Sequence, residues 1–333
     1  MKVLALDFGG SSVKYSVIGS DGSREKEGIA PAPTGTEADW VNCVKGLYEQ
    51  FSDEVEGVAI SQPGKIDPDT GFLSGGGAYF SLWGKNLFDL LRPAIPVPFT
   101  IMNDGKSAAL AEAWNGALAD VRDGVVLIIG TGLAGGVIIN RELLMGHTFA
   151  AGEFSYMGVT PENGMMNSPM GTSSMAGLVT QASAALGVDI MKSEYGALFG
   201  GLKNVGAEMS AEDAPKFSPL NDDPRFEHGV NGKNFMELVG EGNEIAVALY
   251  EKFLKNVYCT LTYIQAILDP EVIAIGGGIT HAPRFIPDLQ KVVEDSKMGS
   301  LAMPINVRPC AVTGSPNEFG AAYHFFRTNG ILQ

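Results

Sequence analysis

Three glycine-rich turns, each placed after an apolar run, are the first residues of this sequence that could do chemistry. Glycine lets backbone N–H groups approach phosphate oxygens, because no Cβ stands in the way. Asp7 ends the first apolar run, where a carboxylate can hold Mg²⁺ through water, and Lys14 lies in the next strand. One such turn is weak evidence, but three favour phosphate binding. The turns contain Gly9-Gly10-Ser11-Ser12, Gly130-Thr131-Gly132 and Gly276-Gly277-Gly278.

The pair Asn103-Asp104 stands where an expected strand meets an expected helix. An aspartate at such a junction is often only a helix N-cap. Its place just before the second glycine turn also favours a base that takes the proton of a hydroxyl during phosphoryl transfer. We expect Lys106 to point to solvent, because beside Asp104 it would lower the pKa of that carboxylate and weaken the base.

Strands and helices alternate along the chain, with the glycine turns at strand ends. A hairpin of two strands opens the chain, and residues 67–83 are expected to form a surface loop. The apolar spacing predicts strands over 3–6, 13–18, 55–60, 98–102, 125–129, 137–139 and 272–275, and helices over 37–52, 107–118, 173–186, 243–268 and 317–326. This order predicts an α/β protein that binds its ligands at the ends of its strands.

Composition excludes several classes of function. The net charge of −15 disfavours nucleic acid and anionic membranes as partners. Cys43, Cys259 and Cys310 are far apart, which argues against a disulfide framework and indicates a cytoplasmic protein. The longest apolar stretch, residues 125–139, is too short and too rich in glycine to cross a bilayer.

Six segments, in this order and spacing, resemble the ROK family of sugar kinases and sugar-responsive repressors. The resemblance implies a two-lobed, actin-like (ribonuclease H-like) ATPase fold of the α/β class with a central cleft. It places a small lobe at 1–103 plus about 313–333 and a large lobe at 104–312. The segments read LDFGGSSVKYSVIGSDG, SQPGKIDPDTG, NDGKSAALAE, IGTGLAGGVIINRELLMG, AGEFSYM and VIAIGGGIT.

The resemblance also implies a role for each singled-out residue. Asp104 is the catalytic base, and Asp7 lies near the magnesium of ATP-Mg²⁺. The first phosphate loop comprises Gly9, Gly10, Ser11, Ser12 and Lys14; the second comprises Gly130, Thr131 and Gly132; Gly276, Gly277 and Gly278 form the turn on the adenosine side. The sugar-binding residues are Asn103, Glu153, Tyr156, Gly64 and Gly77.

Two departures from the family pattern bear on the substrate. Tyr156 stands where the family usually has a histidine, and Val179 where it usually has an acid; both of these usually hold the sugar near its anomeric end. The segment MGTSSMAG replaces the usual cysteine motif, so we expect no structural zinc. These features resemble the β-glucoside kinase branch, in which the aromatic ring of Tyr156 would suit a larger, partly apolar group.

The sequence thus predicts an ATP-dependent kinase of a sugar hydroxyl, the 6-hydroxyl of a glucose unit or a β-glucoside being favoured. Two alternatives stay open: a monosaccharide kinase acting on glucose, N-acetylmannosamine or fructose, and a non-catalytic sugar sensor of the same family. The expected partners are a small sugar and, as in many family members, a second copy of the chain, with no nucleic acid and no membrane.

Overall fold

The computed structural model describes the chain except for residues 34, 160–167, 197–217, 297–302 and 333. Its contacts divide the chain into two compact units. The first unit comprises Met1–Val126, Gly135–Gly152 and Cys310–Gln333, and the second comprises Leu127–Ala134 and Glu153–Pro309. The first unit therefore includes residues 104–126, whereas the sequence analysis ends the small lobe at residue 103. None of the helices in the described parts is both long and apolar enough to cross a membrane.

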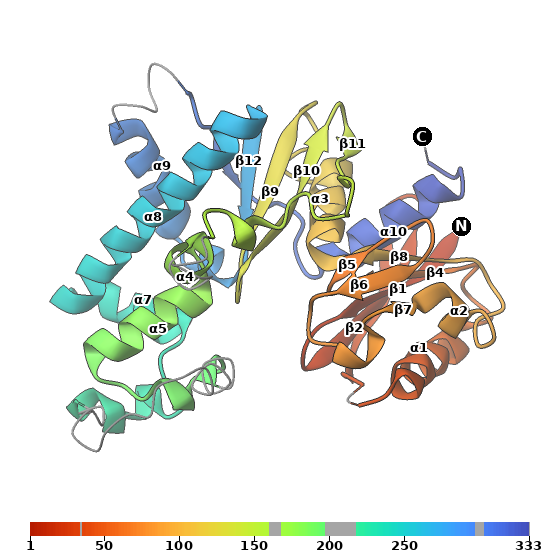
Figure 1. Cartoon of the computed structure of the whole chain (residues 1–333), viewed down its shortest axis with the longest axis horizontal. Helices are drawn as coiled ribbons and strands as arrows, with labels where there is room; N and C mark the ends of the chain where they lie inside the picture. Colours follow the sequence, from red (N-terminus) through yellow and green to blue (C-terminus); the bar gives the residue numbers. More distant parts are fainter. Residues whose placement is uncertain (34, 160–167, 197–217, 297–302, 333) are drawn as a thin grey trace. The chain divides into compact units, whose positions relative to one another are not determined.

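A five-stranded sheet forms the centre of the first unit (Figure 1). Its order is β3-β2-β1-β4-β8; β1 pairs antiparallel with β2, and β1, β4 and β8 run parallel. The opening hairpin predicted from the sequence is therefore confirmed. The strands are β1 (Lys2–Phe8), β2 (Ser12–Gly19), β3 (Arg24–Pro31), β4 (Val58–Gln62) and β8 (Phe99–Asn103).

The alternation of side chains along β1 divides the core of the first unit in two. Leu4, Leu6 and Phe8 pack with α1 (Glu37–Phe51) through a cluster that includes Trp40. Val3 and Ala5 point to the other face and pack with α10 (Pro316–Thr328). Asp7 has the same parity as Val3 and Ala5, so its carboxylate faces α10 rather than α1.

Helix α3 (Asp104–Asn115) is buried on all sides between residues 105 and 113, and this overturns one expectation. Lys106 is fully buried rather than exposed to solvent. The helix has four alanines, one glycine and one serine among its residues, so its neighbours approach closely: a Cβ on Gly105 would lie 2.7 Å from the nitrogen of Gly135. Helical spacing alone does not reveal a helix that has no solvent face.

A small antiparallel sheet occupies part of the segment expected as a loop over 67–83, so that expectation is wrong in part. It comprises β5 (Lys65–Ile66), β6 (Phe72–Gly75) and β7 (Lys85–Asn86), with the 3₁₀ turn η1 (Phe80–Leu82) and then α2 (Leu87–Leu91). Each strand has four residues or fewer, too short for a period of two to be visible in the sequence.

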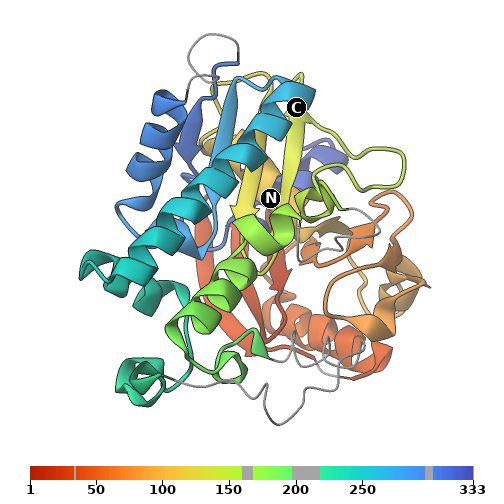
Figure 2. The same ribbon diagram turned by 60° about the vertical axis from the view of Figure 1, so that its left-hand side comes forward.

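The second sheet has the order β11-β10-β9-β12-β13. The division between the units passes through β9 and β10. Within the second unit, α5 lies beside α8 (Figure 2). The strands are β9 (Gly124–Ile129), β10 (Leu133–Ile139), β11 (Glu142–Leu143), β12 (Val272–Gly276) and β13 (Val307–Pro309), and the helices are α4 (Pro169–Ser173), α5 (Met175–Leu186), α7 (Gly232–Gly240), α8 (Glu244–Leu268) and α9 (Phe285–Asp295).

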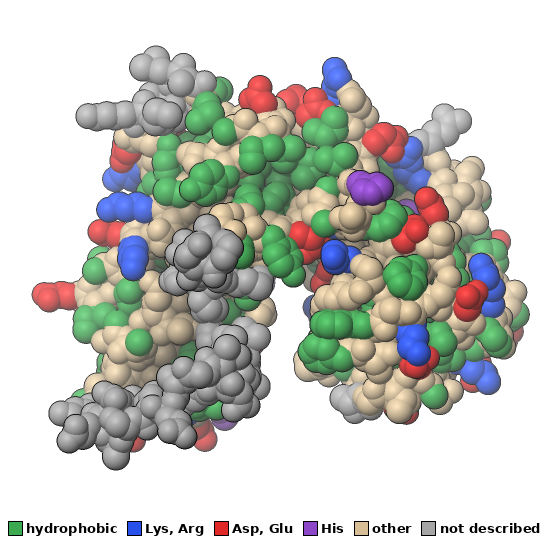
Figure 3. Space-filling view, viewed as in Figure 1, with side chains coloured by type: hydrophobic (Ala, Val, Ile, Leu, Met, Phe, Trp, Pro, Cys, Tyr) green, Lys and Arg blue, Asp and Glu red, His purple; other side chains and the backbone are tan. Residues whose placement is uncertain are grey.

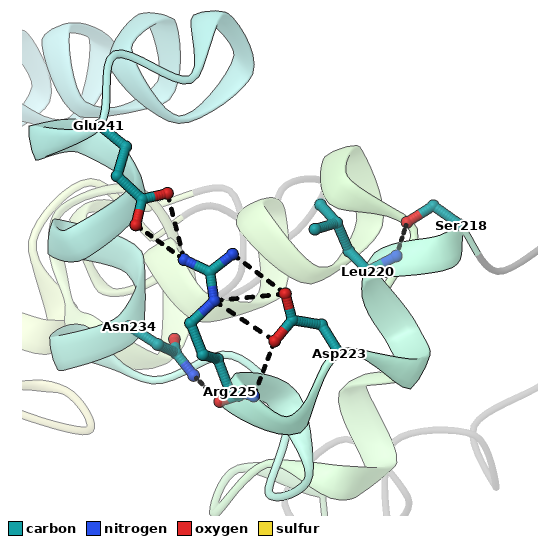
Figure 4. A network of polar contacts seen from close by, with 6 residues as sticks. All are labelled: Ser218, Leu220, Asp223, Arg225, Asn234 and Glu241. Carbon is teal, nitrogen blue, oxygen red and sulfur yellow. Dashed lines mark hydrogen bonds and ion pairs between the residues drawn. The ribbon is translucent and has the colours of Figure 1, made fainter.

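A polar network around Arg225 fixes the approach to α7 (Figure 4). The guanidinium contacts Asp223 at 3.0 Å and, at 2.9 Å, Glu241, which caps the C-terminal end of α7. The hydrogen bonds that the guanidinium donates to Asp223 and then to Glu241 raise the pKa of Arg225. Asn234 in α7 donates to the Arg225 carbonyl at 3.0 Å. The network therefore links both ends of α7 to the turn that precedes it.

His324 in α10 is half-buried with its Nε2 inside the protein, and it should make the protein less stable in mild acid. Burial lowers the pKa of His324 from 6.5 to about 4. Well above pH 6.5 His324 is neutral in both states and does not lower the free energy of unfolding. As the pH falls toward 4, the unfolded chain binds a proton that the folded chain does not, which lowers the free energy of unfolding by about 2–3 kcal/mol. In urea unfolding, His324→Leu should lose less stability between neutral and mildly acidic pH than the parent. The exposed His147→Leu serves as the control. If His324→Leu and the parent lose the same stability, other groups cause the acid sensitivity.

Candidate active site

In the first unit, Asn103 and Asp104 join β8 to α3, and the structure decides which of them caps the helix. The Asn103 Oδ1 accepts from the Lys106 backbone N–H at 3.0 Å, so Asn103 is the N-cap. Its Nδ2 donates to the Gly64 carbonyl and to Asp104 Oδ1, both at 2.9 Å. The Gly105 N–H also donates to Asp104 Oδ1, at 2.8 Å. Because capping is done by Asn103, the Asp104 carboxylate is held in place without being the cap.

Gly64 and Gly77 shape the backbone beside this pair. Gly64 has φ +118° and Gly77 has φ +71°, conformations that favour glycine. A Cβ on Gly64 would lie 2.8 Å from the Gly76 carbonyl oxygen, and one on Gly77 would lie 2.6 Å from Cβ of Pro63. The turn after β4 and the glycines after β6 therefore pack backbone against backbone next to Asn103.

Asp7 is held by two side chains that the sequence analysis missed. Ser61 Oγ at 2.9 Å and Asn317 Nδ2 at 3.1 Å both donate to the same oxygen, Oδ1. Burial raises the pKa of Asp7, and the hydrogen bonds from Asn317 and Ser61 and the charge of Lys14 act in the opposite direction. The β1–β4 register places Ser61 beside Asp7, whereas nothing in the sequence links Asn317 to a residue 310 positions away.

The first predicted phosphate loop is the turn between β1 and β2. The Gly9 N–H donates to the Ser12 carbonyl at 2.9 Å, which closes the turn. Gly10, Ser11 and Lys14 are exposed, and a Cβ on Gly10 would meet no atom within 4 Å. The turn thus leaves backbone and hydroxyl donors accessible, as binding of an anion requires.

The second and third predicted loops lie in the second unit. Gly130, Thr131 and Gly132 connect β9 to β10, and the Met175 N–H donates to the Gly130 carbonyl at 2.9 Å. Gly277 follows β12 with φ +103°, and a Cβ there would collide with the backbone of Ile129. Gly276 and Gly278 flank it. The two loops therefore touch, and only glycine fits at the contact.

A cavity of 690 Å³ opens beside these loops, within the second unit. The sequence analysis missed most of its lining, because α7 begins only after a long polar stretch without periodicity. Burial and then the charge of Glu194 raise the pKa of the Tyr195 phenol, which therefore stays neutral. The lining mixes apolar and polar side chains around Gly130 and Gly278: Met175, Met236, Ile279, Pro283, Tyr195, Asn231, Lys233, Glu237 and Arg284 among them.

Glu153 and Tyr156 lie in the 3₁₀ segment η2 (Phe154–Tyr156) and its N-cap. Ser155 Oγ accepts from the Leu133 N–H at 2.8 Å and donates to the Leu133 carbonyl at 3.1 Å, which fixes this segment to the start of β10. Tyr156 is 62% exposed, whereas Val179 in α5 is 1% exposed. Of the two departures from the family pattern, only Tyr156 is accessible to a ligand.

The segment MGTSSMAG, Met170–Gly177, is held by hydrogen bonds from its own side chains and from α8. Ser174 caps α5 by accepting from the Gly177 N–H at 3.1 Å. Thr260 contacts Ser173 at 3.1 Å, and Asn256 donates to the Thr172 carbonyl at 3.2 Å. Within the described residues, no three His, Cys, Asp or Glu side chains gather where they could hold a metal. That this chain has no structural zinc stays a prediction.

The comparison with protein families decides the lineage of this chain. The model of the ROK family matches residues 3–182 and 202–325. The chain belongs to the ROK family. The family prediction from the sequence is confirmed.

Three relatives in the ROK family illustrate the range of the similarity. A β-glucoside kinase of Listeria monocytogenes is 27% identical over 98% of both chains. The structure of the Lmo2764 protein of the same species matches with a TM-score of 0.77 at 27% identity, over 99% of this chain and 100% of that one. The structure of a glucokinase of Streptomyces griseus, solved with glucose and AMPPNP, matches with a TM-score of 0.74 at 20% identity. The match covers 97% of this chain and 98% of that one. These likenesses confirm the predicted fold.

Proposed function

We propose that this chain is an ATP-dependent sugar kinase that transfers a phosphoryl group to a hydroxyl of a glucose unit, the 6-hydroxyl being favoured. The observation that carries the proposal is the Asn103–Asp104 pair, in which a carboxylate is fixed at the end of β8 by Asn103 and by the Gly105 N–H. The resemblance to ROK kinases gives Asp104 the role of base, and Asn103 rather than Asp104 is the N-cap of α3.

Asp104 takes the proton of the attacking sugar hydroxyl. A carboxylate does this best when it is within hydrogen-bonding reach of the hydroxyl and does not need to reorient. Asn103 supports it in two ways, because its Nδ2 orients Asp104 and also ties the Gly64 carbonyl to the site. Asn103, Gly64 and Gly77 are proposed to line the sugar in the first unit, and Glu153 and Tyr156 are the proposed sugar ligands of the second.

The cavity of 690 Å³ in the second unit is proposed to hold the base and ribose of ATP. Its volume lies in the usual range for a ligand site, roughly 300–1,000 Å³. Its lining combines apolar side chains such as Met175, Met236 and Ile279 with many polar ones, which suits a heteroaromatic base that carries a ribose. The phosphates would meet the backbone N–H groups of the loops at Gly130–Gly132 and Gly276–Gly278, and, in the first unit, the exposed turn at Gly9–Ser12 with Lys14. ATP supplies the phosphoryl group.

Asp7 is proposed to hold the Mg²⁺ of the nucleotide through water. The donor set fits, because a single carboxylate beside phosphate oxygens is the usual protein contribution to a magnesium site. Ser61 and Asn317 both occupy Oδ1, so Oδ2 is the oxygen proposed to face the hydrated ion. The ion would neutralise phosphate charge as the phosphoryl group leaves.

We propose a cytoplasmic location and a homodimer. The three cysteines are free thiols, as expected in a reducing compartment. Hydrophobic side chains gather around the carboxyl-terminal half of α8 (Figure 3), where Tyr263 is 52% and Ile267 is 75% exposed. This face offers a second copy of the chain an apolar surface.

A panel of acceptors tests the function. ADP release would be followed with ATP-Mg²⁺ and glucose, N-acetylmannosamine, fructose, cellobiose, gentiobiose or an aryl β-glucoside. We expect turnover on a glucose unit, with a β-glucoside accepted. Turnover on another monosaccharide alone would keep the kinase and overturn the substrate. ATP hydrolysis that is independent of any sugar, or sugar binding without turnover, would overturn the kinase itself.

A further inference from the structure

Two aromatic side chains of the first unit, a few residues after Gly77, are exposed side by side. Phe80 is 70% exposed and Trp83 is 42% exposed. Their ring centroids lie 4.9 Å apart with the planes at 55°. Exposed aromatic rings cost free energy in water, so a contiguous pair is a candidate binding surface rather than a packing element.

The pair is held rigidly, although its faces are open. Trp83 Nε1 donates to the Gly76 carbonyl at 2.9 Å, which anchors the edge of the indole. Tyr79, next to Phe80, donates its hydroxyl to the Gly9 carbonyl at 2.6 Å. Gly75, Gly76 and Gly77 all have positive φ, and the first of them lies against the Trp83 ring. An anchored edge and a free face are what a stacking platform needs, because little side-chain entropy remains to be lost on binding.

A chain of contacts connects this platform to the proposed base. Trp83 bonds to the Gly76 carbonyl, and that same oxygen would lie 2.8 Å from a Cβ on Gly64. The Gly64 carbonyl accepts from Asn103, which also donates to Asp104. All of these residues belong to the first unit. Gly76 and Gly64 therefore link the Phe80–Trp83 pair to Asn103, one of the proposed sugar ligands of the first unit.

Beside Phe80 the surface is hollowed into a cavity of 230 Å³. That is less than the roughly 300–1,000 Å³ of a site for a whole ligand, and so suits one ring of a larger molecule. The lining carries no charged side chain: it comprises Gly10, Pro33, Gly35, Thr36, Trp40, Ala78, Tyr79, Phe80 and Ser81.

We infer that Phe80 and Trp83 form the subsite for the group attached to the anomeric oxygen of a β-glucoside, a second sugar ring or an aryl ring. The inference rests on the proposed kinase function. The C–H face of a pyranose and the face of an aryl ring are both apolar and flat, so either can stack on an aromatic side chain. Free glucose has no such ring and would not reach the platform.

Four variants test the platform, with kcat/KM measured for glucose, cellobiose and an aryl β-glucoside. Phe80→Ala should lower kcat/KM for the two glucosides by about five- to tenfold and leave glucose within about twofold. Phe80→Tyr keeps the flat ring and should retain the preference, whereas Phe80→Leu keeps apolar bulk without the ring and should lose it. Phe72→Ala removes another exposed phenylalanine, 44% exposed on β6 of the same small sheet, and should change nothing.

Each other outcome overturns the inference in a recognisable way. An equal fall for glucose and the glucosides in Phe80→Ala would mean that the ring supports the fold or the glucose site. Unchanged glucoside kinetics would mean that the aromatic pair serves another partner, such as a protein. A parent enzyme that phosphorylates glucose but no glucoside would overturn the subsite and leave the kinase standing, and a parent that phosphorylates no sugar would overturn the proposed function as well.

Discussion

Asp104→Asn lowers kcat of sugar phosphorylation by about 10²- to 10⁴-fold, the range that a positioned general base contributes. The amide oxygen of asparagine can still accept from the Asn103 Nδ2 and the Gly105 N–H, which now bind Asp104 Oδ1 at 2.9 and 2.8 Å. The fold should therefore survive, while the amide cannot take a proton from the sugar hydroxyl. ADP release with saturating sugar measures the loss, and KM for the sugar should change much less.

The matched control is Asp89→Asn on the surface of α2 in the same unit, where the carboxylate contacts Arg92 at 2.8 Å. It should keep full activity, because an exposed ion pair contributes about 0–1 kcal/mol. Asp104→Asn with near-normal kcat and an unchanged melting temperature would remove Asp104 from the role of base. A melting temperature that falls with activity would instead require the loss to be measured per folded molecule.

The sequence could predict the lineage and the elements that carry the loops, because these depend on local patterns. Glycine turns after apolar strands are visible in the sequence, and the structure places the turns at Gly10, Thr131 and Gly277 between or after strands, as expected. The longest helix was predicted at 243–268 and is found at Glu244–Leu268. Its start and end are local events, a capping asparagine and the Asp269-Pro270 pair.

What the sequence could not predict depends on contacts between distant residues. Asn317 reaches Asp7, and Glu112 reaches Ala311, across separations of 310 and 199 residues. Lys106 occupies a position that would be solvent-facing on an isolated helix, and only the packing around α3 buries it. The lining of the cavity at Tyr195 and Lys233 is likewise assembled from segments with no shared pattern.

Glu112 is a buried acid whose removal should cost much stability. It lies on α3, two turns after Asp104, and is 1% exposed. Its carboxylate accepts from the backbone N–H of Ala117 at 2.6 Å, of Ala311 at 3.0 Å and of Val312 at 2.9 Å. The buried Ala117 N–H left without an acceptor costs about 1–3 kcal/mol and the part-buried donors of Ala311 and Val312 cost less, so Glu112→Ala should lower the free energy of unfolding by about 2–4 kcal/mol. The midpoint of urea unfolding measures this, with the exposed Glu142→Ala as control.

The same variant, Glu112→Ala, tests whether Glu112 has a structural role or a catalytic one. Burial, followed by the charge of Glu112 and a hydrogen bond to it, raises the pKa of the Cys310 thiol, so this cysteine should react slowly with iodoacetamide in the parent. Removing Glu112 frees the segment Cys310–Val312 from α3, and both alkylation of Cys310 and hydrogen exchange at the Ala311 and Val312 amides should become faster. Because Glu112 lies two turns beyond Asp104 and holds backbone N–H groups and the Cys310 thiol, kcat per folded molecule should stay within a few-fold of the parent. Unchanged exchange at those amides would show that α10 holds this segment without Glu112. A loss of kcat as deep as that of Asp104→Asn would mean that the hydrogen bonds of Glu112 help to position the base.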